Sequence, residues 1–120
     1  MSYVLLIVEP RGQREERTPE EAQHAYAEMV RFGEGLQTRG LLRASESLRS
    51  DDEGVRVTVR GGKRSLLDGP FAESKEMVGG FFLLDCDTRE QAVEIAAECP
   101  AAAWASVEVR ELGPCHGGRT

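Results

Sequence analysis

The sequence predicts an α+β domain of the ferredoxin-like βαββαβ type, with an antiparallel sheet that carries two helices on one face. Three observations predict it: short apolar runs that read as strands, two stretches with apolar residues at helical spacing, and the order of these elements. The order is strand, helix, two strands, loop, strand, helix, strand, which is the split βαβ pattern. The chain has 120 residues, 40% of them hydrophobic, so one domain with its own core is expected. We place it at residues 1–112 and expect a flexible C-terminal tail at 113–120.

The element boundaries follow from caps and turn residues. Thr18 is expected to cap a helix that starts at Pro19, with Glu21 completing a capping box and Gly40 ending the helix. Its apolar stripe is Ala22, Ala25, Tyr26, Met29, Gly33 and Leu36. Asp87 or Thr88 should cap a second helix, which Pro100 stops. Strands are expected at 3–8, 41–48, 55–60, 65–67, 78–86 and 104–112, and a charged loop at 11–17.

Two of the expected strands, 3–8 and 78–86, are apolar on both faces. An antiparallel sheet with helices on one face usually leaves its other face polar and wet. Something must therefore cover the second face here. A second copy of the chain, packed sheet against sheet, is the simplest solution, so we predict a homodimer.

Charge and hydropathy exclude several classes of partner. The chain has 15 Lys and Arg against 21 Asp and Glu, a net charge of −6. Nucleic acid and anionic membranes are not expected as partners, because both are bound through clustered basic residues. One basic cluster is present, but valines and glycines interrupt it, which is typical of a solvated strand face. Its residues are Arg56, Arg60, Lys63 and Arg64. The first apolar run is too short for a leader or a membrane span, so we expect a cytoplasmic protein.

The cysteines and histidines do not predict a metal site. Cys86, Cys99 and Cys115 are odd in number and lack the paired spacing of zinc ligands. We expect reduced thiols, and neither a metal nor another cofactor.

The most distinctive segment is DGPFAESKE at residues 68–76, followed by VGGF at 78–81. Chemically it is a shaped loop with two carboxylates and one amine at its exit, and two interpretations stay open. In the first, the loop locks a hairpin or seals the dimer, with Lys75 in an ion pair. In the second, it borders a pocket between sheet and helices, where Asp68 or Glu73 acts as a general base. The residues expected to contact a ligand are then Phe71 as a wall, Lys75 as an anion anchor, and Gly69 and Pro70, which shape the loop.

This segment resembles the signature of the DGPF family within the YCII-related proteins, with Ser74 in place of a threonine. The resemblance runs from YVLLI at 3–7 to SVEVR at 106–110. It implies a dimeric α/β barrel whose biochemical role is mostly unassigned. Some relatives are thought to pair a histidine of the first helix with a carboxylate, which makes His24 a third catalytic candidate. The helical wheel, however, turns His24 away from the apolar stripe, toward solvent or a partner subunit.

Two functions are compatible with these observations. The resemblance implies a small acid–base enzyme acting on a small polar organic molecule, since related proteins include a dehydrochlorinase-type activity. The alternative is a non-catalytic, ligand-sensing or regulatory dimer, because DGPF-like proteins are often encoded beside extracytoplasmic-function sigma factors. The catalytic candidates are Asp68, His24 and Glu73.

Overall fold

Four strands form one antiparallel sheet with the order β2-β5-β1-β6, which is consistent with a ferredoxin-like fold. The computed structural model describes residues 2–71 and 73–116. Along the chain the elements are β1 (Ser2–Pro10), α1 (Gln13–Glu16), α2 (Pro19–Thr38), β2 (Leu42–Ser47), η1 (Asp51–Glu53), β3 (Val55–Arg60), β4 (Lys63–Asp68), β5 (Glu76–Asp85), α3 (Arg89–Glu98), η2 (Pro100–Ala103) and β6 (Ser106–Glu111). The predicted α+β class with an antiparallel sheet is therefore confirmed. A closed barrel and a dimer stay predictions.

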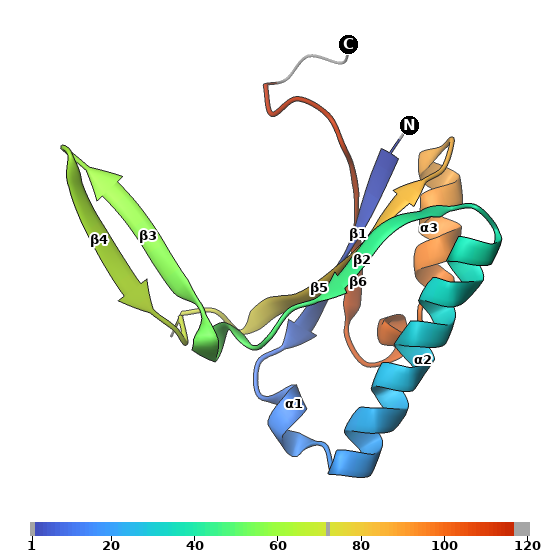
Figure 1. The fold of residues 1–120 in the computed structure, drawn as a ribbon, viewed down its shortest axis with the longest axis horizontal. Coiled ribbons are helices and arrows are strands. Elements are labelled where there is room, and N and C mark those ends of the chain that lie inside the picture. Colours follow the sequence, from blue (N-terminus) through green and yellow to red (C-terminus); the bar gives the residue numbers. More distant parts are fainter. Residues whose placement is uncertain (1, 72, 117–120) are drawn as a thin grey trace.

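Helices α2 and α3 cover the same face of the sheet (Figure 1). Alternate residues of β1, Tyr3, Leu5 and Ile7, point to this face and are buried. Phe82 and Leu84 of β5 lie opposite Leu5 and Tyr3 in the register and complete the centre of the core. The core thus lies between the sheet and the helices.

The predicted caps of α2 are confirmed. The Thr18 hydroxyl accepts from the Glu21 backbone N–H at 3.1 Å, and Glu21 Oε1 accepts from the Thr18 N–H at 2.8 Å. Gly40 follows the helix at φ +73°, a conformation that favours glycine. The apolar stripe is only partly packed, however. Gly33 and Leu36 are buried, whereas Tyr26 is 63% exposed.

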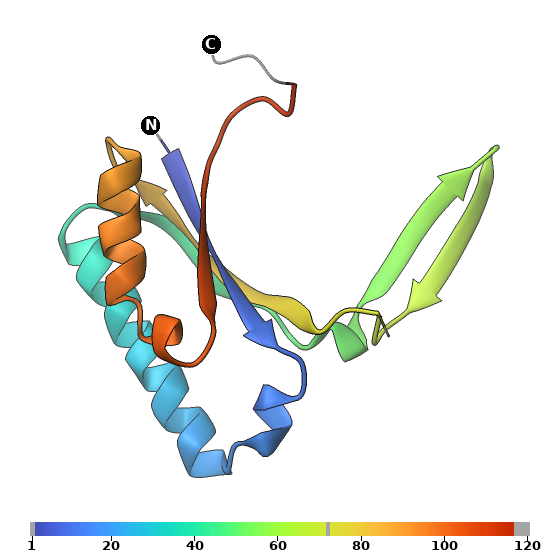
Figure 2. The same cartoon turned by 180° about the vertical axis from the view of Figure 1, so that it is seen from behind.

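Helix α3 also matches the prediction. The Thr88 hydroxyl accepts from the Gln91 N–H at 3.1 Å, and the stripe Ala92, Ile95 and Ala96 is buried. Pro100 opens η2, which leads into β6 at the edge of the sheet (Figure 2).

The prediction of a charged loop at 11–17 is wrong, because residues 13–16 form the short helix α1. Gly12, at φ +89°, turns the chain out of β1 directly before this helix. The polar residues of α1 are adequate helix formers, and Arg14 is anchored by an ion pair to Glu9.

Strands β3 and β4 form a separate two-stranded hairpin, which we call the arm (Val55–Asp68). Figures 1 and 2 show it projecting from the body of the molecule. Gly61 and Gly62 make its turn at φ +57° and +76°, so the turn requires glycine-like freedom at both positions. The strand predicted at 55–60 is present, but none of its residues is buried. Val55, Val57 and Val59 are 52–57% exposed, because β3 pairs only with β4 and lies off the main sheet.

The face of the main sheet opposite the helices is apolar, as expected from the sequence. We call it the free face and define it by Val4, Leu6, Val8, Val78, Phe81 and Leu83. These side chains are partly exposed, and Val78 is 42% exposed. The free face is therefore a hydrophobic surface on the described part of the chain.

Within the described residues, no helix is both long enough and apolar enough to cross a membrane. Residues 113–116 follow β6 as exposed chain. Residues 117–120 of the predicted tail lie outside the described residues.

Candidate functional site

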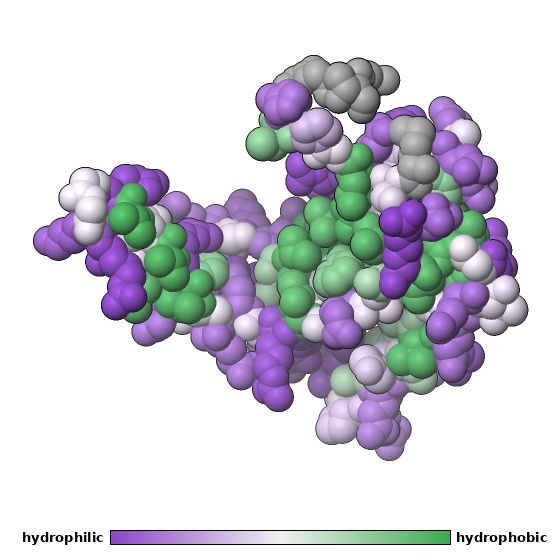
Figure 3. All heavy atoms as spheres, turned by 45° about the horizontal axis from the view of Figure 1, so that its top comes forward, coloured by the Kyte–Doolittle hydropathy of each residue, from purple (hydrophilic) through white to green (hydrophobic). Residues whose placement is uncertain are grey.

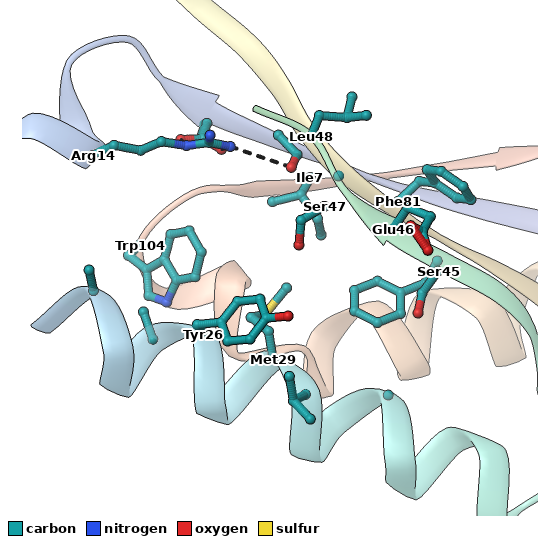
Figure 4. A pocket seen from close by; sticks show the side chains of 18 of the residues that line it. Ile7, Arg14, Tyr26, Met29, Ser45, Glu46, Ser47, Leu48, Phe81 and Trp104 are labelled. Atoms are coloured by element: carbon teal, nitrogen blue, oxygen red, sulfur yellow. Dashed lines mark hydrogen bonds and ion pairs between the residues drawn. The ribbon is translucent and has the colours of Figure 1, made fainter. Parts of the chain in front are cut away.

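A cleft of about 670 Å³ lies between α2 and the sheet (Figure 4). It exists because α2 is held to the sheet only at its C-terminal half. There Leu36 is buried, and the Phe32 ring meets Phe82 edge to face with 5.1 Å between centroids. Toward its N-terminal end the helix leaves the sheet, so Tyr26 lines a cleft instead of a closed core, while Met29 lines the cleft and packs partly against the core.

The floor of the cleft is the glycine pair of β5. A Cβ on Gly79 would overlap Glu9 Oε1, and a Cβ on Gly80 would come within 2.9 Å of the Glu46 carbonyl oxygen. The register between β1 and β5 also shifts beside this pair, between Ile7 and Val8. The glycines therefore mark both a bulge and a close approach of neighbouring groups.

At one end of the cleft, Glu9 and Arg14 form a two-bond ion pair. Arg14 Nε donates to Glu9 Oε2 at 2.9 Å, and Arg14 Nη2 donates to Glu9 Oε1 at 2.8 Å. The Glu9 side chain is only 5% exposed, and that of Arg14 is 32% exposed. The bond to Glu9 raises the pKa of Arg14, so this guanidinium stays charged. Among the described residues, Arg14 Nη1 has no acceptor and is free to bind a ligand.

Trp104 forms the wall at the same end. The guanidinium carbon of Arg17 lies 4.4 Å from the centroid of the Trp104 ring, which is a cation–π contact. The Gln13 side-chain amide donates to the Trp104 carbonyl at 2.6 Å. Arg17 therefore lies on the Trp104 ring, at the same end of the cleft as Arg14.

Hydroxyl groups line the middle of the cleft. Ser45 and Ser47 of β2 lie opposite Phe82 and Gly80, so both point to the helix side of the sheet. Figure 4 shows Tyr26 and Ser47 reaching into the space between α2 and the sheet from opposite sides. The same view places Arg14 and Trp104 toward one end and Ser45 toward the other. The cleft can thus bind an acidic group at its arginine end and polar groups along its length.

Comparison with known protein families identifies the chain. The family model for the YCII-related domain matches residues 1–115. The chain belongs to the YCII-related family.

One curated relative of this YCII-related protein comes from Rhizobium meliloti (strain 1021) and is described only as an uncharacterised protein. It is 42% identical over 53 residues, which cover 42% of this chain and 43% of the relative. The match therefore spans less than half of either chain, and the relative's description assigns no activity.

The segment 68–76 of the YCII-related domain lies at the foot of the arm. Asp68 is the last residue of β4, and Gly69 donates its N–H to the Gly54 carbonyl at 2.9 Å. A Cβ on Gly69 would overlap the Asp51 carbonyl oxygen, so this position also requires glycine. The guanidinium carbon of Arg56 lies 4.1 Å from the centroid of the Phe71 ring. These contacts build a compact base for the hairpin.

Arg11 connects this base to the main sheet. Its guanidinium donates to both carboxylate oxygens of Asp51, with 2.6 Å between Nη1 and Oδ1, and its Nε donates to the Ser74 carbonyl at 2.7 Å. The Arg11 backbone N–H donates to the Lys75 carbonyl at 2.9 Å. The side chain of Lys75 is exposed, as is Glu73. None of the residues predicted in this segment lines the cleft.

His24 lies on α2, in a different part of the fold from Asp68 and Glu73 (Figure 1). Its side chain is 73% exposed, which confirms the orientation expected from the helical wheel. Its Nε2 lies 3.1 Å from Glu28 Oε1, one helical turn further along. A second cavity, of about 540 Å³, contains His24 and Glu28 and shares Arg17 and Trp104 with the cleft. The structure therefore gives His24 a carboxylate neighbour but does not bring the three catalytic candidates together.

Several residues that line the cleft were not predicted from the sequence as site residues: Glu9, Arg14, Tyr26, Ser45 and Ser47. Glu9 could have been found, because it continues the alternate row of Tyr3, Leu5 and Ile7 on the buried face of β1. A carboxylate in such a row needs a buried partner. Trp104, the first residue of the strand predicted at 104–112, lies at the wall of the cleft, two residues before β6 begins.

Within residues 2–71 and 73–116, no cluster of three or more His, Cys, Asp or Glu side chains could hold a metal ion. Cys86 and Cys99 are buried and Cys115 is exposed, each as a free thiol. Burial raises the pKa of both buried thiols, so neither is an activated nucleophile.

Proposed function

We propose that the cleft between α2 and the sheet binds a small polar organic molecule that carries an acidic group. The observation that carries this proposal is that Arg14, Arg17 and Trp104 line the same end of the cleft (Figure 4), with Arg17 on the Trp104 ring. A carboxylate bound there would accept from Arg14 Nη1, while a flat or apolar part of the ligand would contact Trp104.

The charges along the cleft favour one orientation of the ligand. Glu9 neutralises Arg14, which leaves one net positive charge at the arginine end. Glu34 of α2, about two helical turns beyond Tyr26, also lines the cleft. A ligand with an acidic group at one end and a hydrogen-bond donor at the other fits this distribution.

The first role we propose is binding without turnover, that is, a ligand-sensing dimer. The buried carboxylate of the cleft, Glu9, has both oxygens engaged by Arg14, so it is not available as a general base. A partnership with an extracytoplasmic-function sigma factor belongs to this proposal.

The second candidate is an acid–base enzyme, and the pair of His24 and Glu28 favours it. An imidazole held 3.1 Å from a carboxylate is the usual arrangement of a histidine base. Because Arg17 and Trp104 line both cavities, a ligand in the cleft would extend toward this pair. In this candidate His24 transfers a proton to or from the ligand. Asp68 and Glu73 take no part, because they lie at the foot of the arm.

A binding experiment with matched variants tests the proposal. A panel of small organic acids is screened by thermal shift, and the dissociation constants of the hits are measured by calorimetry. We expect Arg17→Gln to weaken binding at least about tenfold, since it removes the positive charge that Glu9 does not neutralise at this end of the cleft. Arg31→Gln is the control, because Arg31 is exposed on α2 and does not line the cleft. Equal affinity of the two variants for every hit would contradict the proposal.

His24→Gln separates the two roles. It should abolish turnover of a bound compound if the protein is an enzyme, and it should leave the dissociation constant unchanged if the protein only binds its ligand.

Finer assignments follow from the same observations. We propose that the chain belongs to the DGPF subtype, on the residues 68–76. We also propose a homodimer in which the free faces of two copies pack together into an α/β barrel, because an uncovered apolar sheet face is unfavourable in water. A cytoplasmic location is part of this proposal.

A further inference from the structure

We propose that the arm clasps the second copy of the chain, laying its apolar side against the body of the partner. This inference rests on the homodimer proposed above and adds a specific role for the hairpin.

The arm carries an apolar stripe that is not covered within the described part of the chain. Val55, Val57, Val59 and Leu66 are each 52–60% exposed. Val57 lies directly opposite Leu66 in the register, so these side chains share one face of the hairpin. An isolated two-stranded hairpin is marginally stable in water. Burial of the stripe against another surface would stabilise it.

The position of the arm indicates which surface that is. Figure 1 shows the arm on the side of the sheet away from α2 and α3, which is the side of the free face. Arm and sheet thus enclose an open, V-shaped space. In Figure 3, hydrophobic side chains gather on the arm and also on the body across this gap. A copy seated on the free face would lie between the two apolar surfaces and contact both.

The charge of the arm favours a second copy of this chain as the occupant. The arm contains four basic residues and one acidic residue, a net charge of +3, in a chain of net charge −6, which leaves −9 for the rest. Arg64 lies opposite Val59 and therefore on the same face as the stripe. On the body, Glu46 and Glu108 lie opposite Phe81 and Leu6, at the sides of the free face. A basic arm and an acidic body attract each other between copies.

The foot of the arm is held firmly enough for this role. Arg11 binds both Asp51 of η1 and the Ser74 carbonyl. Gly69, just after β4, donates its N–H to the carbonyl of Gly54, just before β3. The arm is thereby fixed in direction before the partner binds, which lowers the entropy cost of closing it.

Sedimentation velocity on the full chain, with matched variants, tests the inference. Val57→Glu places a charge in the stripe, and Ser65→Glu places the same charge on the opposite face of the hairpin. We expect a dimer for the unmodified chain, at least about tenfold weaker dimerisation for Val57→Glu, and less than about threefold weakening for Ser65→Glu. Raised salt should also weaken the dimer. Because the stripe lies outside the core, both variants should keep the circular dichroism of the folded chain.

Leu6→Glu on the free face distinguishes this inference from the proposed homodimer. If Leu6→Glu abolishes the dimer while Val57→Glu leaves it intact, the arm does not clasp the partner, and the sheet-to-sheet dimer stands. Equal weakening by Val57→Glu and Ser65→Glu would also overturn the contact of the stripe, since only charge would then matter. An unmodified chain that sediments as a 13.2 kDa monomer overturns both proposals. Replacement of residues 56–67 by an Asn-Gly turn gives a second, charge-independent variant, which should dimerise as weakly as Val57→Glu.

Discussion

The carboxylate of Glu9 and the guanidinium of Arg14 meet in a two-bond ion pair directly beside Gly79, where a side chain would not fit. Glu9 is the one charged residue among the buried residues that the structure describes. A buried carboxylate is unfavourable unless it is paired and hydrogen-bonded, and Arg14 does both. Strand β1, helix α1 and the glycine floor of the cleft thus depend on one another.

Gly79→Ala should break this arrangement. The new Cβ would displace the Glu9 carboxylate from Arg14, so we expect the free energy of unfolding to fall by at least about 2 kcal/mol. This is less than for a fully buried pair, because Arg14 is one-third exposed. Gly35→Ala is the control, since its Cβ meets nothing within 4 Å and Ala is the better helix former. It should raise stability by about 0.5–1 kcal/mol. Urea denaturation measures both, and a Gly79→Ala protein of unchanged stability would refute the dependence.

Gly69→Ala should damage the foot of the arm. Here the overlapping atom is the Asp51 backbone carbonyl oxygen, which cannot rotate away as a side chain can. We expect a loss of about 1–3 kcal/mol from the forced backbone shift. Gly113→Ala, which meets open space, should leave the stability unchanged. The same denaturation experiment compares them, and equal midpoints would show that the foot is not tightly packed.

The pair of Arg11 and Asp51 predicts a pH dependence of stability. The hydrogen bonds from Arg11 lower the pKa of Asp51 in the folded protein. The stabilisation is therefore complete above the unfolded pKa of Asp, about 3.9, and is lost as the pH falls through the lower folded value. Asp51→Asn should be less stable than the unmodified chain at pH 7, and the difference should shrink below about pH 4.

Asp52→Asn is the control for this measurement. Its carboxylate lies 3.9 Å from Arg11 and its side chain is 53% exposed, so the substitution should cost less at pH 7. A difference between Asp51→Asn and the unmodified chain that stays constant from pH 7 to pH 2 would contradict the assignment to this ion pair.

Removal of the N-cap should weaken α2. Thr18→Ala loses the hydroxyl that accepts from Glu21, and we expect a loss of about 1 kcal/mol. Thr38→Ala, at the other end of the helix, removes a hydroxyl bond to the Glu34 carbonyl but introduces a better helix former. It should be neutral or slightly stabilising. Thermal unfolding should show a lower melting temperature for Thr18→Ala and an equal or slightly higher one for Thr38→Ala.

The thiols should differ in reactivity. Cys115 is exposed, whereas Cys86 and Cys99 are buried, and burial raises their pKa. Titration with a chromogenic disulfide should modify one thiol per chain rapidly in the native protein, and all three in denaturant. Rapid modification of more than one native thiol would show that the core opens.

Local patterns predicted most of the elements because they act over a few residues. The capping box of Thr18 and Glu21, the helix end at Gly40, and the stop at Pro100 each depend on neighbours in the chain. The order of strands and helices then restricted the sheet to few topologies, and the one observed is among them.

The candidate site was less predictable, because its residues come from distant segments. Glu9, Tyr26, Ser47, Gly79 and Trp104 meet only after β1, α2, β2, β5 and the segment before β6 have packed. The composition of the segment 68–76 suggested a pocket between sheet and helices, yet the segment lies at the foot of the arm. Neither its residues nor His24 line the cleft, so their predicted roles stay predictions.

The sequence by itself determined the α+β class, the caps of both long helices, the exposure of His24 and the presence of apolar residues on both faces of β1 and β5. These follow from propensity and periodicity, which are local properties. Only the tertiary structure decided that α2 leaves the sheet at Tyr26 to open a cleft, and that β3 and β4 stand apart as an arm. Both depend on which distant segments pack against each other. The sequence pattern of a strand is the same whether or not another element covers its apolar face.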